Sequence, residues 1–353
     1  MNAVKRAIIP IFIPHLACPH RCVFCDQTTI SGSIGCPSSM QVKETIERYL
    51  ETIPKGRLIE VAFFGGSFTG IPTKQQEGLL SVAQNYLRIG KIHNIRVSTR
   101  PDYIDKARLE LLTNFGVNII EIGVQSLDDS VLAKSGRGHS KEQSIYACQL
   151  IKEQGFQLGI QLMPGLPGSN DESDMDTVLN VIELRPDFCR VYPTLVIKGT
   201  LLHRMYNQGK YRPMSLEQGI NRVKRVTAAL YIKEIPVIRI GLHPSKQLED
   251  ALLGGPYHPA FGDLIKGRMF YDLQRLGIIG LSGSVRIISG NPLDIAAIKG
   301  FKKINIVRLQ NEFNLKFKIV SNEKISRDSI EISSNNGKMC RYDLLQLFRY
   351  QYN

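Results

Sequence analysis

The sequence lacks an apolar run long enough to cross a membrane. A helical span needs about 18 or more consecutive apolar residues, and the 353-residue chain, of which 22% is charged, contains no such run. The opening MNAVKRAIIPIFIPHLAC has a basic start and an apolar stretch, but Pro10, Pro14 and His15 interrupt it. No small-residue cleavage site precedes the cysteines. We therefore expect neither a secretory signal nor a membrane partner.

The sequence is also poor in cysteine. Seven cysteines in a chain of this length, without a secretory signal, argue against a disulfide framework and favour a reducing cytoplasm. Four of them, Cys36, Cys148, Cys189 and Cys340, are scattered along the chain, and we expect them to be small buried apolar residues. The other three stand together near the start.

Acidic residues are too few to balance the basic ones, which leaves a formal net charge of +13. An enzyme that acts on small neutral metabolites has no need of such an excess. The charge favours phosphate-rich partners, namely nucleic acid, nucleotides or anionic lipid, with a merely solvated basic surface as the alternative.

Short apolar runs alternate with segments of helical periodicity between Ala7 and Val196. Near-continuous apolar runs such as LIEVAFFGG and VNIIEIGVQS are typical of strands covered on both faces. The repeated strand–helix units predict an α/β fold with a parallel (β/α) barrel, complete or open, and a doubly wound sheet is the alternative. In either fold the carboxyl ends of the strands form one rim, where motifs distant in sequence converge.

The pattern changes after Val196. The segment SLEQGINRVKRVTAALYIKEI predicts a long basic amphipathic helix, and a third kind of segment begins near Asn291. Residues 301–353 hold ten lysines and arginines against five aspartates and glutamates, a net charge of +5. We predict a core domain over residues 1–275 and a small basic α+β domain over residues 285–353.

The cysteines of HLACPHRCVFCDQ, namely Cys18, Cys22 and Cys25, are the strongest chemical signal. A structural zinc site takes four ligands, usually in two spaced pairs, and no second pair lies nearby. A four-iron cluster that only carries electrons takes four thiolates, so three thiolates leave one iron free to bind a substrate or cofactor. We favour this open iron. Zinc, with His15 or His20 as a fourth ligand, and a plain electron carrier are the alternatives.

The spacing CxxxCxxC after a first strand resembles that of the radical S-adenosylmethionine (radical SAM) superfamily, with Phe24 at the aromatic position. The resemblance implies a partial (β/α) barrel, a four-iron four-sulfur cluster on the three cysteines, and S-adenosylmethionine chelating the open iron. It also implies an external electron donor and cleavage of the cofactor to methionine and a 5′-deoxyadenosyl radical, which calls for a low cluster potential. Gly65, Gly66 and Ser67, in FFGGSF, are implied to bind the amino group of the cofactor; alone, this motif would indicate only a tight turn.

The resemblance then narrows to the radical domain of the elongator catalytic subunit, a tRNA-modifying enzyme, over residues 9–268. It rests on the segments STRPDYI, EIGVQSLDDSVLAKSGRGHS, MPGLPG and RPDFCRVYPTLVIKGTLL, with weaker similarity to the oxygen-independent coproporphyrinogen oxidases. We expect no counterpart of that subunit's acetyltransferase domain, so its reaction does not carry over as it stands.

Position within these motifs implies further cofactor contacts. Gln125 is implied to contact the ribose or carboxylate of the cofactor, and Arg137 to pair with its carboxylate. Ser98 stands where relatives carry a glutamate. Gln161 stands where the porphyrin branch has an aspartate, and we expect it to bind the ribose without charge. As the alternative, both glutamines are polar side chains that fill the mouth of the barrel. For Glu121 the alternative is that it serves as a structural partner of an arginine.

Two more sets of residues are predicted to contact substrate or RNA. Tyr192 and Lys198, in YPTLVIKG, are predicted to face the substrate, with core packing as the alternative for Tyr192. In the tail, GFKKINIVRLQNEF opens a helix on a glycine–lysine loop, in an order similar to KH-type RNA-binding modules, whose GxxG loop clamps the nucleotide backbone. The second glycine is missing, and Lys302 and Lys303 are the predicted RNA contacts. A small cap on the core is the alternative.

Three functions fit the sequence. The first is a radical SAM enzyme that acts on tRNA or another RNA in the cytoplasm. The second is a radical SAM enzyme that acts on a small anionic metabolite such as a porphyrin. The third is an iron–sulfur protein that binds RNA without turnover.

Overall fold

The computed structural model describes residues 6–13, 22–26, 35–281 and 285–352. The chain divides into two compact units, residues 1–213 with 242–255 and residues 214–241 with 256–353. This division groups residues 214–241 and 256–275 with the C-terminal residues, and the expected domains over residues 1–275 and 285–353 stay a prediction.

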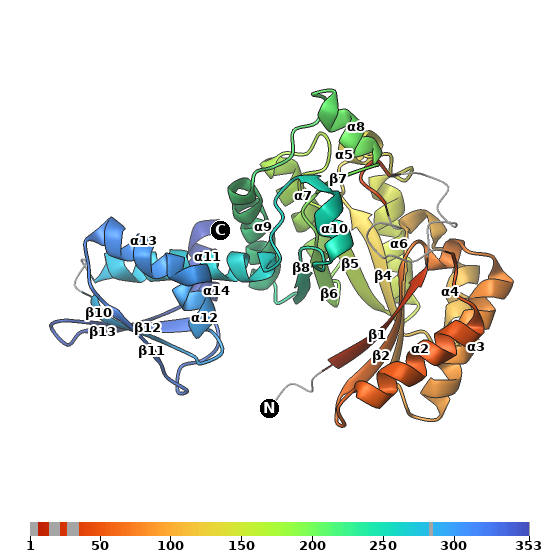
Figure 1. Ribbon diagram of the computed structural model, residues 1–353, viewed down its shortest axis with the longest axis horizontal. Coiled ribbons are helices and arrows are strands. Elements are labelled where there is room, and N and C mark those ends of the chain that lie inside the picture. Colours follow the sequence, from red (N-terminus) through yellow and green to blue (C-terminus); the bar gives the residue numbers. More distant parts are fainter. Residues whose placement is uncertain (1–5, 14–21, 27–34, 282–284, 353) are drawn as a thin grey trace. The chain divides into compact units, whose positions relative to one another are not determined.

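Six strands of the first unit follow one another across the main sheet (Figure 1). They are β1 (Arg6–Ile13), β2 (Leu58–Gly65), β3 (Asn94–Thr99), β4 (Ile119–Gln125), β5 (Gln157–Leu162) and β6 (Phe188–Val191). The sheet order is β1-β2-β3-β4-β5-β6-β8, with β8 (Val237–Ile240) as the seventh strand. Neighbouring strands from β1 to β6 are parallel. Because the order follows the sequence and never reverses, the sheet is a curled half-barrel, and the doubly wound alternative is wrong.

Helices connect these strands, as the periodicity predicted. They are α2 (Ser39–Thr52), α3 (Thr73–Arg88), α4 (Lys106–Asn114), α5 (Asp129–Lys134), α6 (Lys141–Glu153) and α7 (Asp171–Glu183), with the 3₁₀ turns η2 (Phe68–Gly70) and η3 (Pro101–Tyr103). Ser38, Ser140 and Asn170 each close a capping box at the start of α2, α6 and α7. Such boxes satisfy free amides of the first helical turn, so the sequence itself fixes where these helices begin.

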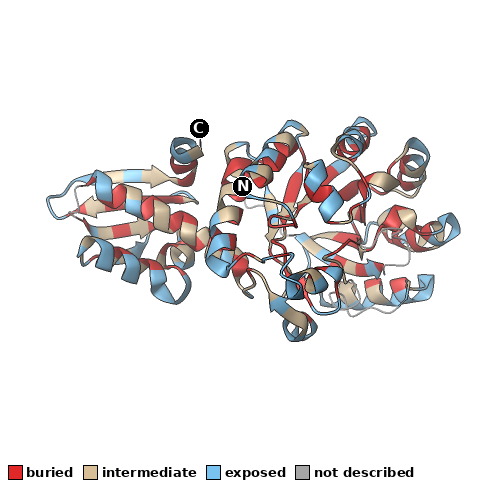
Figure 2. Cartoon of the chain, turned by 90° about the horizontal axis from the view of Figure 1, so that it is seen from above, coloured by how far each residue is buried: buried red, intermediate tan, exposed pale blue. Residues whose placement is uncertain are grey.

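The core of the first unit lies between the strands and these helices. Alternate strand residues such as Ile95, Val97, Ile120 and Ile122 are fully buried. Figure 2 shows the buried positions gathered on the strands and on one side of the helices. β4 is buried at every position, as expected of a strand covered on both faces.

Smaller elements complete the first unit. They are β7 (Val196–Ile197), α8 (Leu201–Asn207), α10 (Lys246–Ala251) and β9 (Leu252–Gly254). β7 pairs antiparallel with β9. In the described part of the chain, no helix is both long enough and apolar enough to span a bilayer.

The second unit has a sheet of its own. Its elements are α9 (Leu216–Ile232), α11 (Phe261–Gly280), β10 (Val285–Gly290), α12 (Ile295–Lys299), η4 (Phe301–Lys303), α13 (Ile304–Phe313), β11 (Lys318–Ser321), β12 (Ser329–Ser334), β13 (Met339–Asp343) and α14 (Leu344–Tyr352). The strand order is β11-β10-β12-β13, with β10 parallel to β11 and antiparallel to β12. The predicted helix in SLEQGINRVKRVTAALYIKEI and the predicted helix after the glycine–lysine loop are confirmed as α9 and α13.

Candidate active site at the carboxyl ends of the strands

The turn after β2 closes against the end of β1. The Gly66 amide donates to the Ile13 carbonyl at 2.6 Å. A Cβ on Gly65, whose φ is +103°, would lie 2.5 Å from the same oxygen, so only glycine fits. Ser67 follows and is buried. These residues therefore stand beside the end of β1, from which the chain continues to the cysteines; their contact with a cofactor amino group stays a prediction.

Two of the three clustered cysteines lie in the described part of the chain. Cys22 and Cys25 share a tight turn, in which the Cys25 amide donates to the Cys22 carbonyl at 3.1 Å, and neither forms a disulfide. Cys18 lies outside the described residues, as do His15 and His20. Among the residues described, no three histidine, cysteine or acidic side chains group into a metal site. The described part of the predicted ligand set is thus two thiols one short turn apart.

Neighbouring helices fix this cysteine turn. The Val23 amide donates to the Ser135 carbonyl after α5 at 3.0 Å, and the Val23 carbonyl accepts from the Leu202 amide of α8 at 2.7 Å. Phe24 packs on an apolar cluster, which consists of Val23, Val196, Leu202 and Tyr211. The turn is therefore held by backbone bonds on both sides and by apolar packing beneath.

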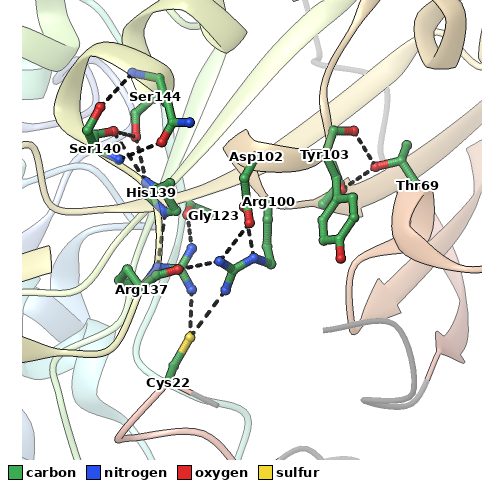
Figure 3. A network of polar contacts seen from close by, with 12 residues as sticks. Cys22, Thr69, Arg100, Asp102, Tyr103, Gly123, Arg137, His139, Ser140 and Ser144 are labelled. Carbon is green, nitrogen blue, oxygen red and sulfur yellow. Dashed lines mark hydrogen bonds and ion pairs between the residues drawn. The ribbon is translucent and has the colours of Figure 1, made fainter. Parts of the chain in front are cut away.

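Two arginines converge on the sulfur of Cys22 (Figure 3). Arg137 donates from Nη1 to Cys22 Sγ at 3.1 Å, and Arg100 donates from Nη1 to the same atom at 3.5 Å. Each arginine is only 4% exposed. Hydrogen bonds from charged donors are the strong ones, and on a metal-binding sulfur they orient the ligand and tune its electronics.

The other donors of Arg137 join it to β4 and α6. Its Nη2 donates to the Gly123 carbonyl, and its Nε donates to His139 Nε2 at 3.2 Å. The Nδ1 of His139 lies 3.1 Å from Ser144 Oγ. Burial, and next the charge of Arg137, lower the pKa of His139 to about 3. The ring is therefore neutral, with the lone pair on Nε2 accepting from Arg137 and the proton on Nδ1.

Arg100 is clamped by an acid two residues further on. Its Nε and Nη2 donate to the two carboxylate oxygens of Asp102 at 2.9 and 3.0 Å, and Nη2 also donates to the Arg137 carbonyl. On the neighbouring part of the rim, the hydroxyl of Thr69 donates to the Tyr103 carbonyl at 2.8 Å (Figure 3). The guanidinium of Arg100 thus joins the end of β3, the loop before α6 and the cysteine turn.

Buried polar groups without a hydrogen-bond partner also mark the rim. Within the described residues they include Gln125 Oε1, Ser98 Oγ and Thr194 Oγ1. Gln125 has a φ of +69°, which is uncommon outside glycine, and its Nε2 lies 2.8 Å from where a Cβ on Gly123 would stand. Since buried polar groups are normally satisfied, these atoms fit a polar ligand. Together with the thiols, they fit a metal cluster with a polar cofactor beside it.

Gln161 joins a chain of buried charges that runs across the strands. Its Nε2 donates to Glu121 Oε1. Glu121 pairs with Arg96 at 3.2 Å and with Arg190 at 3.1 Å, and Arg96 pairs with Glu60 at 2.6 Å. We call these four charged residues the strand ion cluster. The alternative in which Glu121 serves an arginine is confirmed, whereas the contact of Gln161 with a ribose stays a prediction.

The two predicted substrate residues lie on different elements. Tyr192 follows β6, and its hydroxyl accepts from Arg190 Nη1 at 3.1 Å. Lys198 follows β7 and is exposed. A Cβ on the next residue, Gly199, would lie 3.9 Å from Asp26 Oδ2. Tyr192 therefore adjoins the strand ion cluster, and Lys198 adjoins the segment that carries the cysteines.

The predicted RNA contacts belong to the second unit. Lys302 and Lys303 lie in η4, both are exposed, and their φ angles are +50° and +62°. They are thus on a different unit from the strand-end residues.

Comparison with known families decides which chemistry this geometry serves. The model of the radical SAM superfamily matches residues 12–180, and that of the Radical_SAM C-terminal domain matches residues 186–271. The chain belongs to the radical SAM superfamily. It is therefore an enzyme. The cofactors of the radical SAM superfamily are a four-iron four-sulfur cluster and S-adenosylmethionine.

Curated radical SAM relatives match the same region. A tRNA uridine(34) acetyltransferase of Methanocaldococcus jannaschii is 28% identical over 256 residues, which cover 61% of this chain and 47% of the relative. Elongator complex protein 3 of Mus musculus is 27% identical over 267 residues, which cover 63% of this chain and 49% of the relative. The chain thus spans about half the length of these curated relatives. The predicted resemblance to the elongator radical domain is confirmed.

A solved structure shares the fold. Methanocaldococcus infernus Elp3 with an N-terminal deletion matches with a TM-score of 0.61 and 22% identity, over 78% of this chain and 64% of that chain. At this identity the likeness concerns the fold alone, and it agrees with the half-barrel and the sequential strand order.

Three residues of this radical SAM site were not predicted from the sequence: Arg100, Asp102 and His139. Each stands in a motif that was recognised, STRPD or SGRGH. Arg100 and Asp102 could have been found from their spacing. An arginine that stands two residues before an acid at the end of a strand can form two hydrogen bonds with that acid. Nothing in either motif says which sulfur the arginine reaches.

Proposed function

We propose that this radical SAM enzyme modifies a nucleoside of tRNA at the strand-end site. The observation that supports it most directly is the convergence of Arg100 and Arg137 on Cys22, beside the unpartnered polar atoms of Ser98 and Gln125. The choice of tRNA draws on the names of the relatives and on the net charge of +13, which suits a phosphate-rich substrate.

In this proposal the thiolates of Cys18, Cys22 and Cys25 hold the cluster and leave one metal corner without a protein ligand. When bound, the cluster and S-adenosylmethionine supply a carbon radical able to abstract hydrogen, after reduction by an external donor. Three thiolates suit iron–sulfur chemistry, and a reducing compartment would preserve them. Arg100 and Arg137 hold Cys22 in position through hydrogen bonds to its sulfur.

The remaining rim residues serve the cofactor in this proposal. Gln125 and Ser98 supply buried polar atoms for its ribose or amino-acid portion, and the turn of Gly65 to Ser67 supplies close backbone approach. Arg137 would pair with the cofactor carboxylate through the second N–H of each Nη, since its other N–H groups donate to Cys22, Gly123 and His139. Phe24 lends apolar packing beneath, and Gln161 offers its remaining amide oxygen.

Substrate would approach from the side where Tyr192 and Lys198 lie. Lys198 is exposed and follows β7, next to the residue that adjoins Asp26. An exposed ammonium there suits a phosphate of the RNA backbone. RNA as the substrate class comes from the names of the relatives, of whose length the chain spans about half.

The test has two parts. Anaerobically reconstituted, reduced protein should release 5′-deoxyadenosine from S-adenosylmethionine. Nucleosides from tRNA of a deletion strain should lack one modification, which expression of the wild-type chain restores and a C22A/C25A chain does not. An unchanged nucleoside profile together with an altered pool of an anionic metabolite would instead favour the small-molecule enzyme. No 5′-deoxyadenosine at all would favour a binding protein without turnover.

A matched cysteine control separates ligand loss from general damage. Cys148 is fully buried in α6, and burial raises the pKa of its thiol to about 12, so it is unsuited to metal binding. A C148A chain should keep its iron content and its cofactor cleavage, whereas a C22A/C25A chain should lose both. Equal iron in the two variants would contradict the assignment of the cysteine turn.

A further inference from the structure

Part of the second unit is built as strand, helix, loop, helix and strand. β10 leads into α12, the loop Gly300 to Lys303 joins α12 to α13, and β11 follows. β10 and β11 are adjacent and parallel, and β11 is the edge strand of the four-stranded sheet. The loop therefore stands between two helices that connect neighbouring strands. In KH-type modules a GxxG loop clamps the nucleotide backbone. We call residues 300–303 the lysine loop.

The lysine loop is held in a fixed shape by a buried asparagine. Asn305 Nδ2 donates to the Gly267 carbonyl of α11 at 2.8 Å and to the Ala297 carbonyl of α12 at 3.1 Å. Gly300 has a φ of +73°, and a Cβ there would lie 2.6 Å from the Asn305 side chain. Glycine is thus required at the first position of the loop, because Asn305 occupies the space a side chain would need.

Two lysines occupy left-handed backbone positions in this loop. Lys302 and Lys303 have φ angles of +50° and +62°, in a region where glycine is the usual residue. The sequence departs from a GxxG loop at Lys303, yet the backbone keeps a shape that suits glycine there. Non-glycine residues in such conformations persist where the surrounding structure imposes them, and they cluster at functional sites.

The side chains around the lysine loop form a basic surface with apolar patches. Lys302 and Lys303 are exposed, and no carboxylate partner is found for either within the described residues. The Nζ of Lys302 lies 5.6 Å from the centroid of the Phe301 ring. Phe301 is 43% exposed, and His258 packs edge-on against its ring at a centroid distance of 4.8 Å. Ile304 and Val307 of α13 are also large exposed apolar residues. We call these five residues, Phe301, Lys302, Lys303, Ile304 and Val307, the lysine-loop surface.

We propose that the lysine-loop surface binds single-stranded RNA. Exposed ammonium groups without a carboxylate partner suit backbone phosphates, and an exposed aromatic ring held in place suits a stacked base. Single strands, unlike duplexes, splay their bases toward such rings and apolar patches. The inference deepens the proposed function, because it names a second site by which the enzyme would hold its RNA.

The experiment measures binding of the full-length, cluster-loaded chain to a fluorescein-labelled 12-nucleotide oligouridylate by fluorescence anisotropy at several salt concentrations. K302E/K303E should weaken binding roughly tenfold or more and lower the salt slope by about 1.4, since each lost phosphate contact on a single strand is worth about 0.7. K233E/K338E reverses two other exposed lysines of the same unit and should stay within about twofold of the wild type.

Two more variants separate charge, stacking and folding. F301A should weaken binding with an unchanged salt slope, because base stacking involves no phosphate charge. K303G relieves the left-handed lysine, so it should fold at least as well as the wild type, yet it should lower the salt slope by about 0.7. Retained affinity in K303G and K302E/K303E would overturn the proposal.

Other outcomes also decide the matter. No binding of the oligouridylate by the wild-type chain, tighter binding of a 12-base-pair RNA duplex, or equal weakening by K233E/K338E would each overturn the proposal. The result is independent of the proposed catalytic function: K302E/K303E should still release 5′-deoxyadenosine when no RNA is present. If oligouridylate binds as expected but no tRNA modification depends on the chain, the RNA surface stands and the proposed function fails.

Discussion

Replacing Arg100 by lysine tests whether one guanidinium holds the strand-end site together. Arg100 is 4% exposed and donates to both oxygens of Asp102, to the Arg137 carbonyl and to Cys22 Sγ. Lysine keeps the charge but has one nitrogen on a flexible stem. It cannot grip a carboxylate with two parallel bonds and reach the sulfur at the same time. The substitution therefore keeps the positive charge but removes the planar set of donors that joins Asp102, the Arg137 carbonyl and Cys22.

The expected cost follows from the hydrogen bonds that lysine cannot form. Hydrogen bonds to charged groups contribute about 1.5–3 kcal/mol each. Lysine forfeits at least one of the two bonds to Asp102, and the bond to the Arg137 carbonyl adds a smaller amount. We expect R100K to loosen the cysteine turn and the loop before α6 by about 2–4 kcal/mol. The chain should then lose iron on gel filtration, and amides near Arg137 should exchange hydrogen faster.

A nearby pair provides the control. Arg108 also faces an acid of its own turn, Asp105, but its side chain is 37% exposed, and its described hydrogen bonds do not reach the cysteine turn. Exposed pairs contribute little, so R108K should keep the iron content and exchange rates of the wild type. The reasoning is refuted if R100K retains full iron and wild-type exchange near Arg137, or if R108K loses as much iron as R100K.

Two further predictions concern buried charge elsewhere in the first unit. R96M should lower the free energy of unfolding in urea by about 3–5 kcal/mol. It removes the arginine that lies 2.6 Å from the fully buried carboxylate of Glu60, which keeps, among the described residues, the half-exposed Arg6 at 3.5 Å. E60Q/R96M should recover part of that loss, and a double variant no more stable than R96M would contradict this. Burial and the charge of Arg137 lower the pKa of His139 to about 3, so this residue binds fewer protons in the folded state than in the unfolded state. Its contribution to the free energy of unfolding is therefore complete above about pH 6.5 and falls by about 1.4 kcal/mol per pH unit between about pH 6 and pH 4. Unfolding of H139Q should therefore depend less on pH across that range, and curves parallel to those of the wild type would show that His139 is not the titrating group.

Much of the half-barrel could be predicted because its signals are local. LIEVAFFGG and VNIIEIGVQS became β2 and β4 since near-continuous apolar runs have no other stable place than a sheet covered on both faces. Helix starts were equally local, as at Ser140, whose capping box needs only residues within one turn. The choice between a half-barrel and a doubly wound sheet was not local. It depends on which strands pair, and no single segment encodes that.

The candidate site divides in the same way. Cys22 and Gln125 were found from motifs, but the role of Glu121 was open until its ion pairs with Arg96 and Arg190 were known. Arg100 was visible in the sequence as part of STRPD, yet its contact with Cys22 joins residues 78 positions apart. Such partners are set by strand order and sheet curvature, which place the ends of β3 and β4 beside the cysteine turn.

By itself, the sequence determined the cysteine spacing, the alternation of strands and helices, and the excess of positive charge. These are properties of the residues and of their order along the chain, so they exist before any tertiary contact forms. Only the tertiary structure decided that two guanidinium groups meet at Cys22, that Glu121 is held by arginines, and that Lys303 takes a backbone shape usual for glycine. Those features require segments far apart in the sequence to pack together. The free energy that holds these segments together comes from burial and hydrogen bonds throughout the fold.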